Sequence, residues 1–204
     1  MSVSTQTTKL NYDRRTVFNV PNQLTSIRLV LAIVLFALIA YEHYLAGMWV
    51  FIVAAGTDWI DGFYARRYNQ VTTLGRILDP FVDKIIICGT FIFLAAIPSV
   101  GPLLGSGLTP AMAVVVVGRE LLVTALRSFL EQQGADFSAT LSGKLKMVLQ
   151  CLAAAVSLYA LSYGTLVRPE WLQTTLVISI WSAVALTVIS GVAYVFAAIK
   201  LLRQ

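Results

Sequence analysis

Residues 58–83 read DWIDGFYARRYNQVTTLGRILDPFVD, and strongly apolar segments flank this stretch on both sides. It carries four aspartates, Asp58, Asp61, Asp79 and Asp83, together with three arginines and two glycines. Ionisable groups are costly in apolar surroundings, so a cluster of them points to a functional site. The fold and the function therefore both depend on why these carboxylates lie at these spacings.

The composition indicates a membrane environment. Of the 204 residues, 58% are hydrophobic and only 12% are charged, whereas soluble domains carry roughly a quarter charged residues. The two cysteines lie in apolar segments and give no disulfide framework, and the single histidine makes a histidine-rich metal site a poor fit. We therefore predict one polytopic membrane domain that is almost entirely helical.

Six segments are long and apolar enough for a membrane helix, which needs about 20 mainly apolar residues. We predict an all-α protein with six transmembrane helices, preceded by a short cytoplasmic or interfacial segment over 1–20. The six-helix domain occupies 21–204. The predicted spans are 24–44, 46–64, 77–97, 110–130, 145–163 and 171–202.

Lysine and arginine predict the orientation, because short loops rich in them stay in the cytoplasm. With the N-terminus inside, Arg168 alone falls in the loops on the opposite side. We expect a multi-pass protein of the inner or plasma (cell) membrane, with both termini and the active site cytoplasmic. The same asymmetry accounts for the net charge of +5 without nucleic acid.

The spacing of the aspartates predicts that they converge. Asp58 and Asp61 are three residues apart and Asp79 and Asp83 are four apart, so each pair shares one helix face. The two helices that carry them are expected to be antiparallel neighbours. Both pairs then lie at one depth, just inside the membrane on its cytoplasmic side.

Four converging carboxylates favour a metal site. Like charges at low dielectric raise each other's pKa and destabilise the fold, and a divalent cation resolves this conflict. Oxygen ligands select Mg²⁺ or Mn²⁺, and four carboxylates are enough for two ions. The alternative is that the aspartates are ion-paired helix ends, with Asp61 meeting Arg66 and Asp79 meeting Arg76.

Glycine and arginine residues near the aspartates indicate that the site binds a diphosphate. Gly62 follows Asp61, and Gly75 lies one helical turn before Asp79. A missing side chain allows a bulky ligand to approach the backbone, and the guanidinium of Arg66 suits phosphate. Taken singly, each glycine is equally well explained by helix packing.

Written as a pattern, the stretch is D-x2-D-G-x2-A-R-x8-G-x3-D-x3-D. It resembles, without a gap or substitution, the signature of the CDP-alcohol phosphotransferase family. The resemblance implies that an acceptor alcohol attacks the β-phosphorus of a CDP-alcohol and that CMP leaves. It further implies metal ligands at Asp58, Asp61, Asp79 and Asp83, with Asp83 also the base. Asp61, Gly62, Ala65, Arg66 and Gly75 would line the CMP moiety.

Four segments, 18–28, 61–84, 118–128 and 142–150, resemble one branch of this family. In that branch the donor is CDP-diacylglycerol, the acceptor is sn-glycerol 3-phosphate, and the proteins are homodimers. The first segment lies near the nucleotide-lipid site in the family, which adds Asn22, Thr25 and Arg28 as candidate ligands, although Asn22 can also cap the first helix. Met147 departs from the pattern, where threonine is expected.

A phosphorylated acceptor needs a cationic pocket of its own. Arg119 and Arg127 are eight residues apart, about two helical turns, and Lys144 begins the fifth span. An unpaired cation deep in a span is costly, so we predict these three as ligands of the acceptor phosphate. Alternatively, Arg127 pairs with Glu131, and Lys144 and Lys146 are membrane anchors on the cytoplasmic side.

Two other functions stay open at this point. The first is transfer to a different acceptor, namely inositol phosphate, serine or a lipid alcohol. The second is transport of a divalent cation across the membrane. The aspartates argue against transport, because all four are expected near one face of the membrane and no polar path continues from them.

Overall fold

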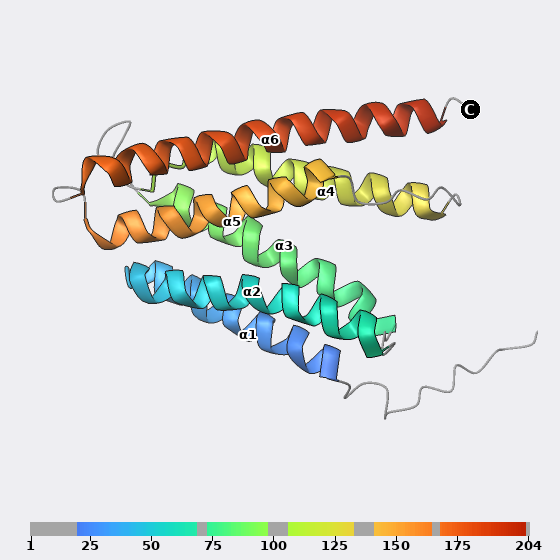
Figure 1. Ribbon diagram of the computed structural model, residues 1–204, viewed down its shortest axis with the longest axis horizontal. Helices are drawn as coiled ribbons and strands as arrows, with labels where there is room; N and C mark the ends of the chain where they lie inside the picture. Colours follow the sequence, from blue (N-terminus) through green and yellow to red (C-terminus); the bar gives the residue numbers. More distant parts are fainter. Residues whose placement is uncertain (1–19, 69–72, 98–105, 133–140, 165–167, 203–204) are drawn as a thin grey trace, which may run out of the picture.

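The computed structural model describes residues 20–68, 73–97, 106–132, 141–164 and 168–202. Within these ranges it leaves out the side chains of 20–22, 24, 58–68, 73–79, 131–132, 141–142, 144 and 201–202. The segment predicted over 1–20 therefore lies, except for its last residue, outside the described residues. The described residues form six helices (Figure 1), namely α1 (Val20–Ala40), α2 (Tyr44–Tyr68), α3 (Thr73–Ala96), α4 (Pro110–Gln132), α5 (Leu141–Ser162) and α6 (Glu170–Leu202). The prediction of an all-helical protein is confirmed.

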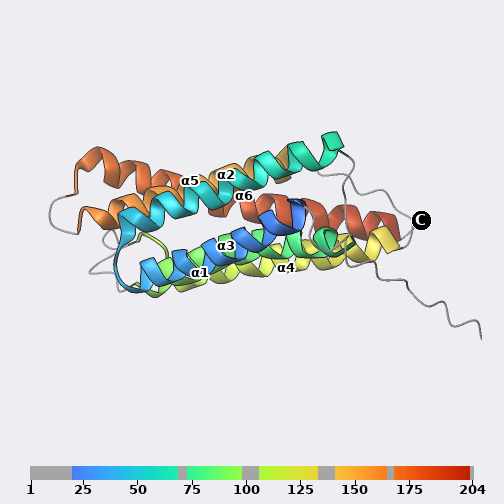
Figure 2. The same ribbon diagram turned by 90° about the horizontal axis from the view of Figure 1, so that it is seen from below.

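Consecutive helices run in opposite directions along one bundle. The ends of α2, α4 and α6 and the beginnings of α1, α3 and α5 lie toward the same end of the molecule (Figures 1 and 2). We call this end the α2–α3 end. Helix α3 packs against α1, α2, α4 and α5, and α6 packs against α4 and α5. A site between α3, α4, α5 and α6 is therefore built by residues from four different helices.

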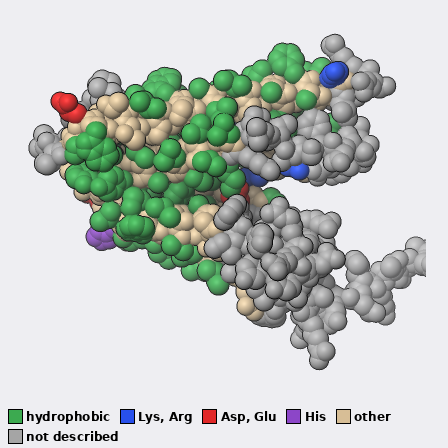
Figure 3. Space-filling model, viewed as in Figure 1, with side chains coloured by type: hydrophobic (Ala, Val, Ile, Leu, Met, Phe, Trp, Pro, Cys, Tyr) green, Lys and Arg blue, Asp and Glu red, His purple; other side chains and the backbone are tan. Residues whose placement is uncertain are grey.

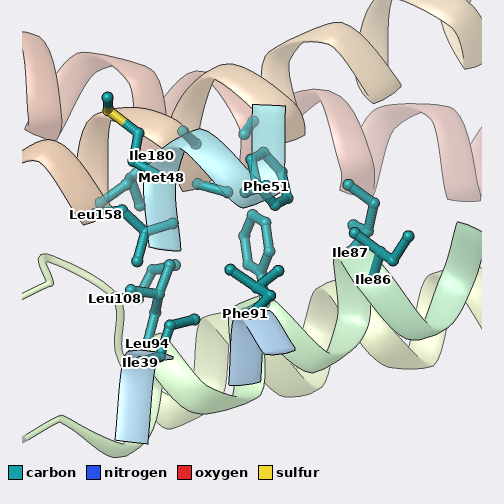
Figure 4. Close-up of a cluster of buried hydrophobic side chains, with 14 of the residues drawn as sticks. Ile39, Met48, Phe51, Ile86, Ile87, Phe91, Leu94, Leu108, Leu158 and Ile180 are labelled. Atoms are coloured by element: carbon teal, nitrogen blue, oxygen red, sulfur yellow. The ribbon is translucent and has the colours of Figure 1, made fainter. Parts of the chain in front are cut away.

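The core is a continuous cluster of buried aliphatic and aromatic side chains from all six helices and from the segment before α4. Phe51 of α2 and Phe91 of α3 are among its largest fully buried members and lie close together in Figure 4. Between α1 and α3, the rings of Phe36 and Phe93 stack with their centroids 5.0 Å apart. Burial of this apolar surface fixes α3 against α1 and α2 and so positions the first turns of α3.

The turn between α1 and α2 begins earlier than the sequence predicts. Helix α1 ends at Ala40, four residues before the predicted span ends. The N–H of Glu42 donates to the carbonyl of Ile39 at 3.1 Å, and that of His43 donates to Leu38 at 2.8 Å. This is the Schellman pattern, and Glu42 takes the left-handed conformation, φ 61°, that glycine usually occupies there.

Helices α2 and α3 are longer than predicted at the ends that face each other. Helix α2 continues to Tyr68 instead of 64, and α3 begins at Thr73 instead of 77. The prediction followed apolar runs, which stop where the polar residues begin. The backbone hydrogen bonds of the helices continue through these polar residues, so both aspartate pairs lie inside helices.

The exterior of the bundle is apolar. Large hydrophobic side chains are exposed along the helices, among them Trp49, Trp171 and Trp181, and hydrophobic side chains cover much of the face in Figure 3. Buried polar groups such as Gln150 and Thr187 lie inside instead. An apolar exterior of this extent is typical of a surface that contacts other apolar material, here lipid.

Two of the described helices are long and apolar enough to cross a membrane by length and composition. They are the segments Leu145–Ser162 and Glu170–Lys200. Two shorter apolar segments, Thr25–Ala40 and Tyr44–Thr57, belong to α1 and α2. Together with the apolar exterior, these helices are those of a membrane protein, whereas the six-span topology stays a prediction.

Candidate active site

The four aspartates lie on two helices that meet at the α2–α3 end. Asp58 and Asp61 are in about the last three turns of α2, and Asp79 and Asp83 are in about the first three turns of α3. Only residues 69–72 separate the two helices. The helix positions agree with the predicted convergence. The side chains of the first three aspartates lie outside the described ones, so their convergence stays a prediction.

The predicted nucleotide-lipid residues are on α1, α2 and α3. Thr25 and Arg28 of α1 are buried, and Arg28, 1% exposed, is the largest fully buried side chain described. Burial of a cation in an apolar bundle indicates a specific role for it. The remaining members of this set have helix positions but no described side chains: Asn22, Asp61, Gly62, Ala65, Arg66 and Gly75.

A cavity of about 580 Å³ lies between α3, α4, α5 and α6. It brings the predicted base and two predicted acceptor ligands together, because Asp83, Arg119 and Arg127 all line it. The side chain of Lys144, the third predicted acceptor ligand, is not described. Six charged side chains line the cavity, which gives its described wall a net charge of +2: Asp83, Lys84, Arg119, Glu120, Arg127 and Lys146.

Glu120 joins two of these cations. Its Oε1 accepts a hydrogen bond from Nζ of Lys146 on α5 and another, at 3.3 Å, from Nη1 of Arg119. Glu120 is 9% exposed and Lys146 5% exposed. A buried carboxylate between two cations offsets their repulsion and holds them side by side. The cluster thus forms a buried part of the cavity wall.

Glu120 is not among the predicted site residues, and Lys146 is predicted only as a membrane anchor at the start of the fifth span. A signal for Glu120 exists, since it is the one acidic residue in the apolar segment 110–130. For Lys146 the sequence offers no comparable signal, because a lysine near the cytoplasmic end of a span is ordinary. Its role becomes visible only through the contact between α4 and α5.

The residues present fit a divalent metal by their chemistry. The predicted donor set consists only of carboxylates, which suits a hard ion such as Mg²⁺ or Mn²⁺. Asp83, the one member with a described side chain, is half-buried and lines the cavity. Among the described side chains, no three His, Cys, Asp or Glu gather as a metal site, and the other three aspartates are outside that set.

Comparison with known proteins identifies the family. The model of the CDP-alcohol phosphatidyltransferase family matches residues 18–195, and the chain belongs to this family. It is therefore a transferase.

Two curated relatives carry the same description, CDP-diacylglycerol–glycerol-3-phosphate 3-phosphatidyltransferase. The protein of Bacillus subtilis (strain 168) is 34% identical over 196 residues, which cover 87% of this chain and 94% of the relative. The protein of Escherichia coli (strain K12) is 32% identical over 188 residues, which cover 89% of this chain and 95% of the relative. The resemblance inferred from the aspartate pattern is confirmed.

Proposed function

We propose that this enzyme transfers a phosphatidyl group from CDP-diacylglycerol to sn-glycerol 3-phosphate. The products are phosphatidylglycerophosphate and CMP, and the reaction belongs to phospholipid biosynthesis. One observation carries the choice of acceptor: Asp83 shares a cavity with Arg119 and Arg127. A phosphorylated alcohol needs cations for its phosphate and a base for its hydroxyl within the length of one small molecule, and this cavity supports both.

The nucleotide end of the donor binds at the facing ends of α2 and α3. Asp61, Gly62, Ala65, Arg66 and Gly75 line the CMP moiety, where a guanidinium suits the phosphates. Asn22, Thr25 and Arg28 of α1 close this part of the site. Two Mg²⁺ or Mn²⁺ ions, held by Asp58, Asp61, Asp79 and Asp83, would neutralise charge on the diphosphate.

Asp83 acts on the acceptor. Its carboxylate accepts the proton of the attacking hydroxyl, whose oxygen forms a bond to the β-phosphorus. The bond between that phosphorus and the oxygen bridging to the α-phosphorus breaks, and CMP leaves. Arg119, Arg127 and Lys144 bind the acceptor's own phosphate and so orient its hydroxyl toward the donor. Positioning of this kind supplies much of the rate enhancement in phosphoryl transfer.

The arrangement in the membrane follows from the substrates. Six spans cross the inner or plasma membrane, with both termini and the active site on the cytoplasmic side. CDP-diacylglycerol enters from the bilayer, and glycerol 3-phosphate enters from water. The family resemblance further supports a homodimer, and no nucleic acid takes part.

An acceptor panel tests the proposal. Purified protein in detergent receives Mg²⁺ and CDP-diacylglycerol, and CMP release is measured with glycerol 3-phosphate, inositol phosphate, serine or phosphatidylglycerol. We expect release with glycerol 3-phosphate alone, and loss of that release after chelation of the metal. Release with another acceptor would replace the proposed substrate, whereas no release from folded protein with any acceptor would contradict the proposal as a whole.

A further inference from the structure

Helix α6 contributes to the wall of the cavity, although no residue of α6 was a candidate in the sequence. Its residue Tyr194 lines the cavity, and α6 packs along α4, which carries Arg119. Arg119 has a long, flexible side chain, and ordering such a side chain costs conformational entropy. Contacts that hold it in one orientation would therefore strengthen its binding to an anion.

Gly191 sets how closely α6 approaches Arg119. A Cβ atom added at residue 191 would lie 3.0 Å from Cγ of Arg119, which is closer than ordinary van der Waals contact. The alkyl part of the arginine thus packs directly on the backbone of α6. Any larger residue at 191 would push the arginine side chain or the helix away.

Tyr194 lies on the same face of α6, three residues after Gly191. The guanidinium carbon of Arg119 is 5.5 Å from the centroid of its ring, within the range of a cation–π interaction. Tyr194 is 8% exposed, so this contact is shielded from water, where such interactions are strongest. A ring face holds the guanidinium without providing an oxygen acceptor for its N–H groups.

The donors of Arg119 are only partly used. Nη1 donates to Glu120, whereas Nε is buried and has no hydrogen-bond partner among the described residues. A buried donor without an acceptor is costly. Glu120 takes only one donor of the guanidinium, and the remaining Nη donors are available to an oxygen of a phosphate bound in the cavity.

We propose that Gly191 and Tyr194 of α6 position Arg119 to bind the phosphate of the acceptor. The proposal rests on the proposed function, and it makes both residues positioning residues that act through Arg119. Glu120 holds one side of the guanidinium, the ring of Tyr194 holds another, and the backbone at Gly191 fixes the alkyl chain. The free edge of the guanidinium then faces the phosphate.

Steady-state kinetics of three variants test this role. Tyr194→Leu removes the ring, Gly191→Ala adds a methyl group against the arginine, and Tyr194→Phe keeps the ring. We expect the first two to raise the KM for glycerol 3-phosphate roughly tenfold, the equivalent of about 1.4 kcal/mol. The KM for CDP-diacylglycerol should stay unchanged, and Tyr194→Phe should behave like the wild type for both substrates.

Gly118→Ala is the matched control. It adds the same methyl group beside Arg119 in the sequence, but into open space, since nothing beyond its chain neighbours and the local helix backbone lies within 4 Å of the added Cβ. It should leave both KM values unchanged. Tyr194→Met, with a large flexible side chain, replaces Tyr194→Leu where the latter does not fold.

The outcomes separate the two proposals. Wild-type protein that does not respond to glycerol 3-phosphate contradicts the proposed function. If the wild type responds, equal increases in both KM values in the variants overturn the positioning role. So does a Tyr194→Phe variant as impaired as Tyr194→Leu, because the ring would then not be what holds Arg119.

Discussion

Glu120 determines the charge balance of the cavity at the scale of single residues. Its carboxylate is the acceptor shared by Arg119 and Lys146, and without it two cations would face each other in a buried wall. The removal of one partner from a buried ion pair typically costs about 3–5 kcal/mol. The residue therefore affects the stability of the fold as well as the shape of the site.

Glu120→Gln tests this stabilising role. The amide keeps the size of the side chain but cannot neutralise the cations, so we expect the free energy of unfolding to fall by about 3 kcal/mol. Chemical or thermal unfolding in detergent measures the change. The double variant Glu120→Gln/Lys146→Met should recover part of the loss, because it removes one unpaired charge. Wild-type stability in the single variant would show that the ion cluster contributes nothing.

Asp83 carries the proposed proton transfer. Asp83→Asn keeps the shape of the side chain and removes its ability to accept a proton, so CMP release should fall by a factor on the order of 10²–10⁴. The variant should remain folded and still bind CDP-diacylglycerol, which a thermal shift on addition of the lipid measures. Turnover near that of the wild type would exclude Asp83 as the base.

At the scale of elements, close packing between α1 and α3 holds the helix that carries Asp79 and Asp83. A Cβ added at Gly89 of α3 would lie 2.2 Å from Cζ of Phe36 on α1, so the ring occupies the space above the glycine. The same ring stacks on Phe93, one turn further along α3. The position of α3 thus depends on the absence of a side chain at residue 89.

Gly89→Ala should separate these helices. An overpacked core costs about 1–3 kcal/mol, so the unfolding midpoint should fall, and the smaller side chain in Gly89→Ala/Phe36→Leu should restore part of the loss. Gly56→Ala serves as the control and should not be destabilised, because the added methyl group meets nothing within 4 Å beyond its chain neighbours and the local helix backbone. Equal changes in the unfolding midpoint for Gly89→Ala and Gly56→Ala would mean that helix propensity, and not packing against Phe36, causes the change.

The helix ends show what local sequence can and cannot predict. Apolar length located all six helices. The end of α1 was missed because Glu42, and not glycine, takes the left-handed position of its final turn. The facing ends of α2 and α3 were placed too far apart because a hydropathy pattern cannot follow a helix through charged residues. In each case the backbone hydrogen bonds determine where the helix ends, and these bonds cannot be inferred from composition.

At the scale of the whole molecule, sequence spacing and the family resemblance suggest members of the site, and their roles stay predictions. Asp83, Arg119 and Arg127 were expected in the site, and one cavity contains them. The pairing of Glu120 with Lys146 and the contact of Tyr194 with Arg119 join residues on different helices. Such contacts depend on how the helices pack, so no spacing along a single helix predicts them.

The distribution of polar groups also has meaning only in the assembled bundle. Buried polar side chains such as Gln150 and Thr187 bond to each other between α5 and α6 at 3.0 Å, while the exterior carries exposed apolar side chains. In apolar surroundings a polar group requires a partner inside the protein. Among the described residues, the cavity lined by six charged side chains departs from this arrangement, which supports the proposed chemistry there.

In the proposed reaction, the hydroxyl of glycerol 3-phosphate attacks the β-phosphorus of CDP-diacylglycerol. The most direct test of this reaction uses glycerol 3-phosphate labelled with ¹⁸O in the attacking hydroxyl, with mass spectrometry of both products. We expect one ¹⁸O in every molecule of phosphatidylglycerophosphate and none in CMP, with the two products formed in equal amounts. Phosphatidate with a labelled nucleotide product, or CMP released without a labelled lipid, would contradict the proposed reaction.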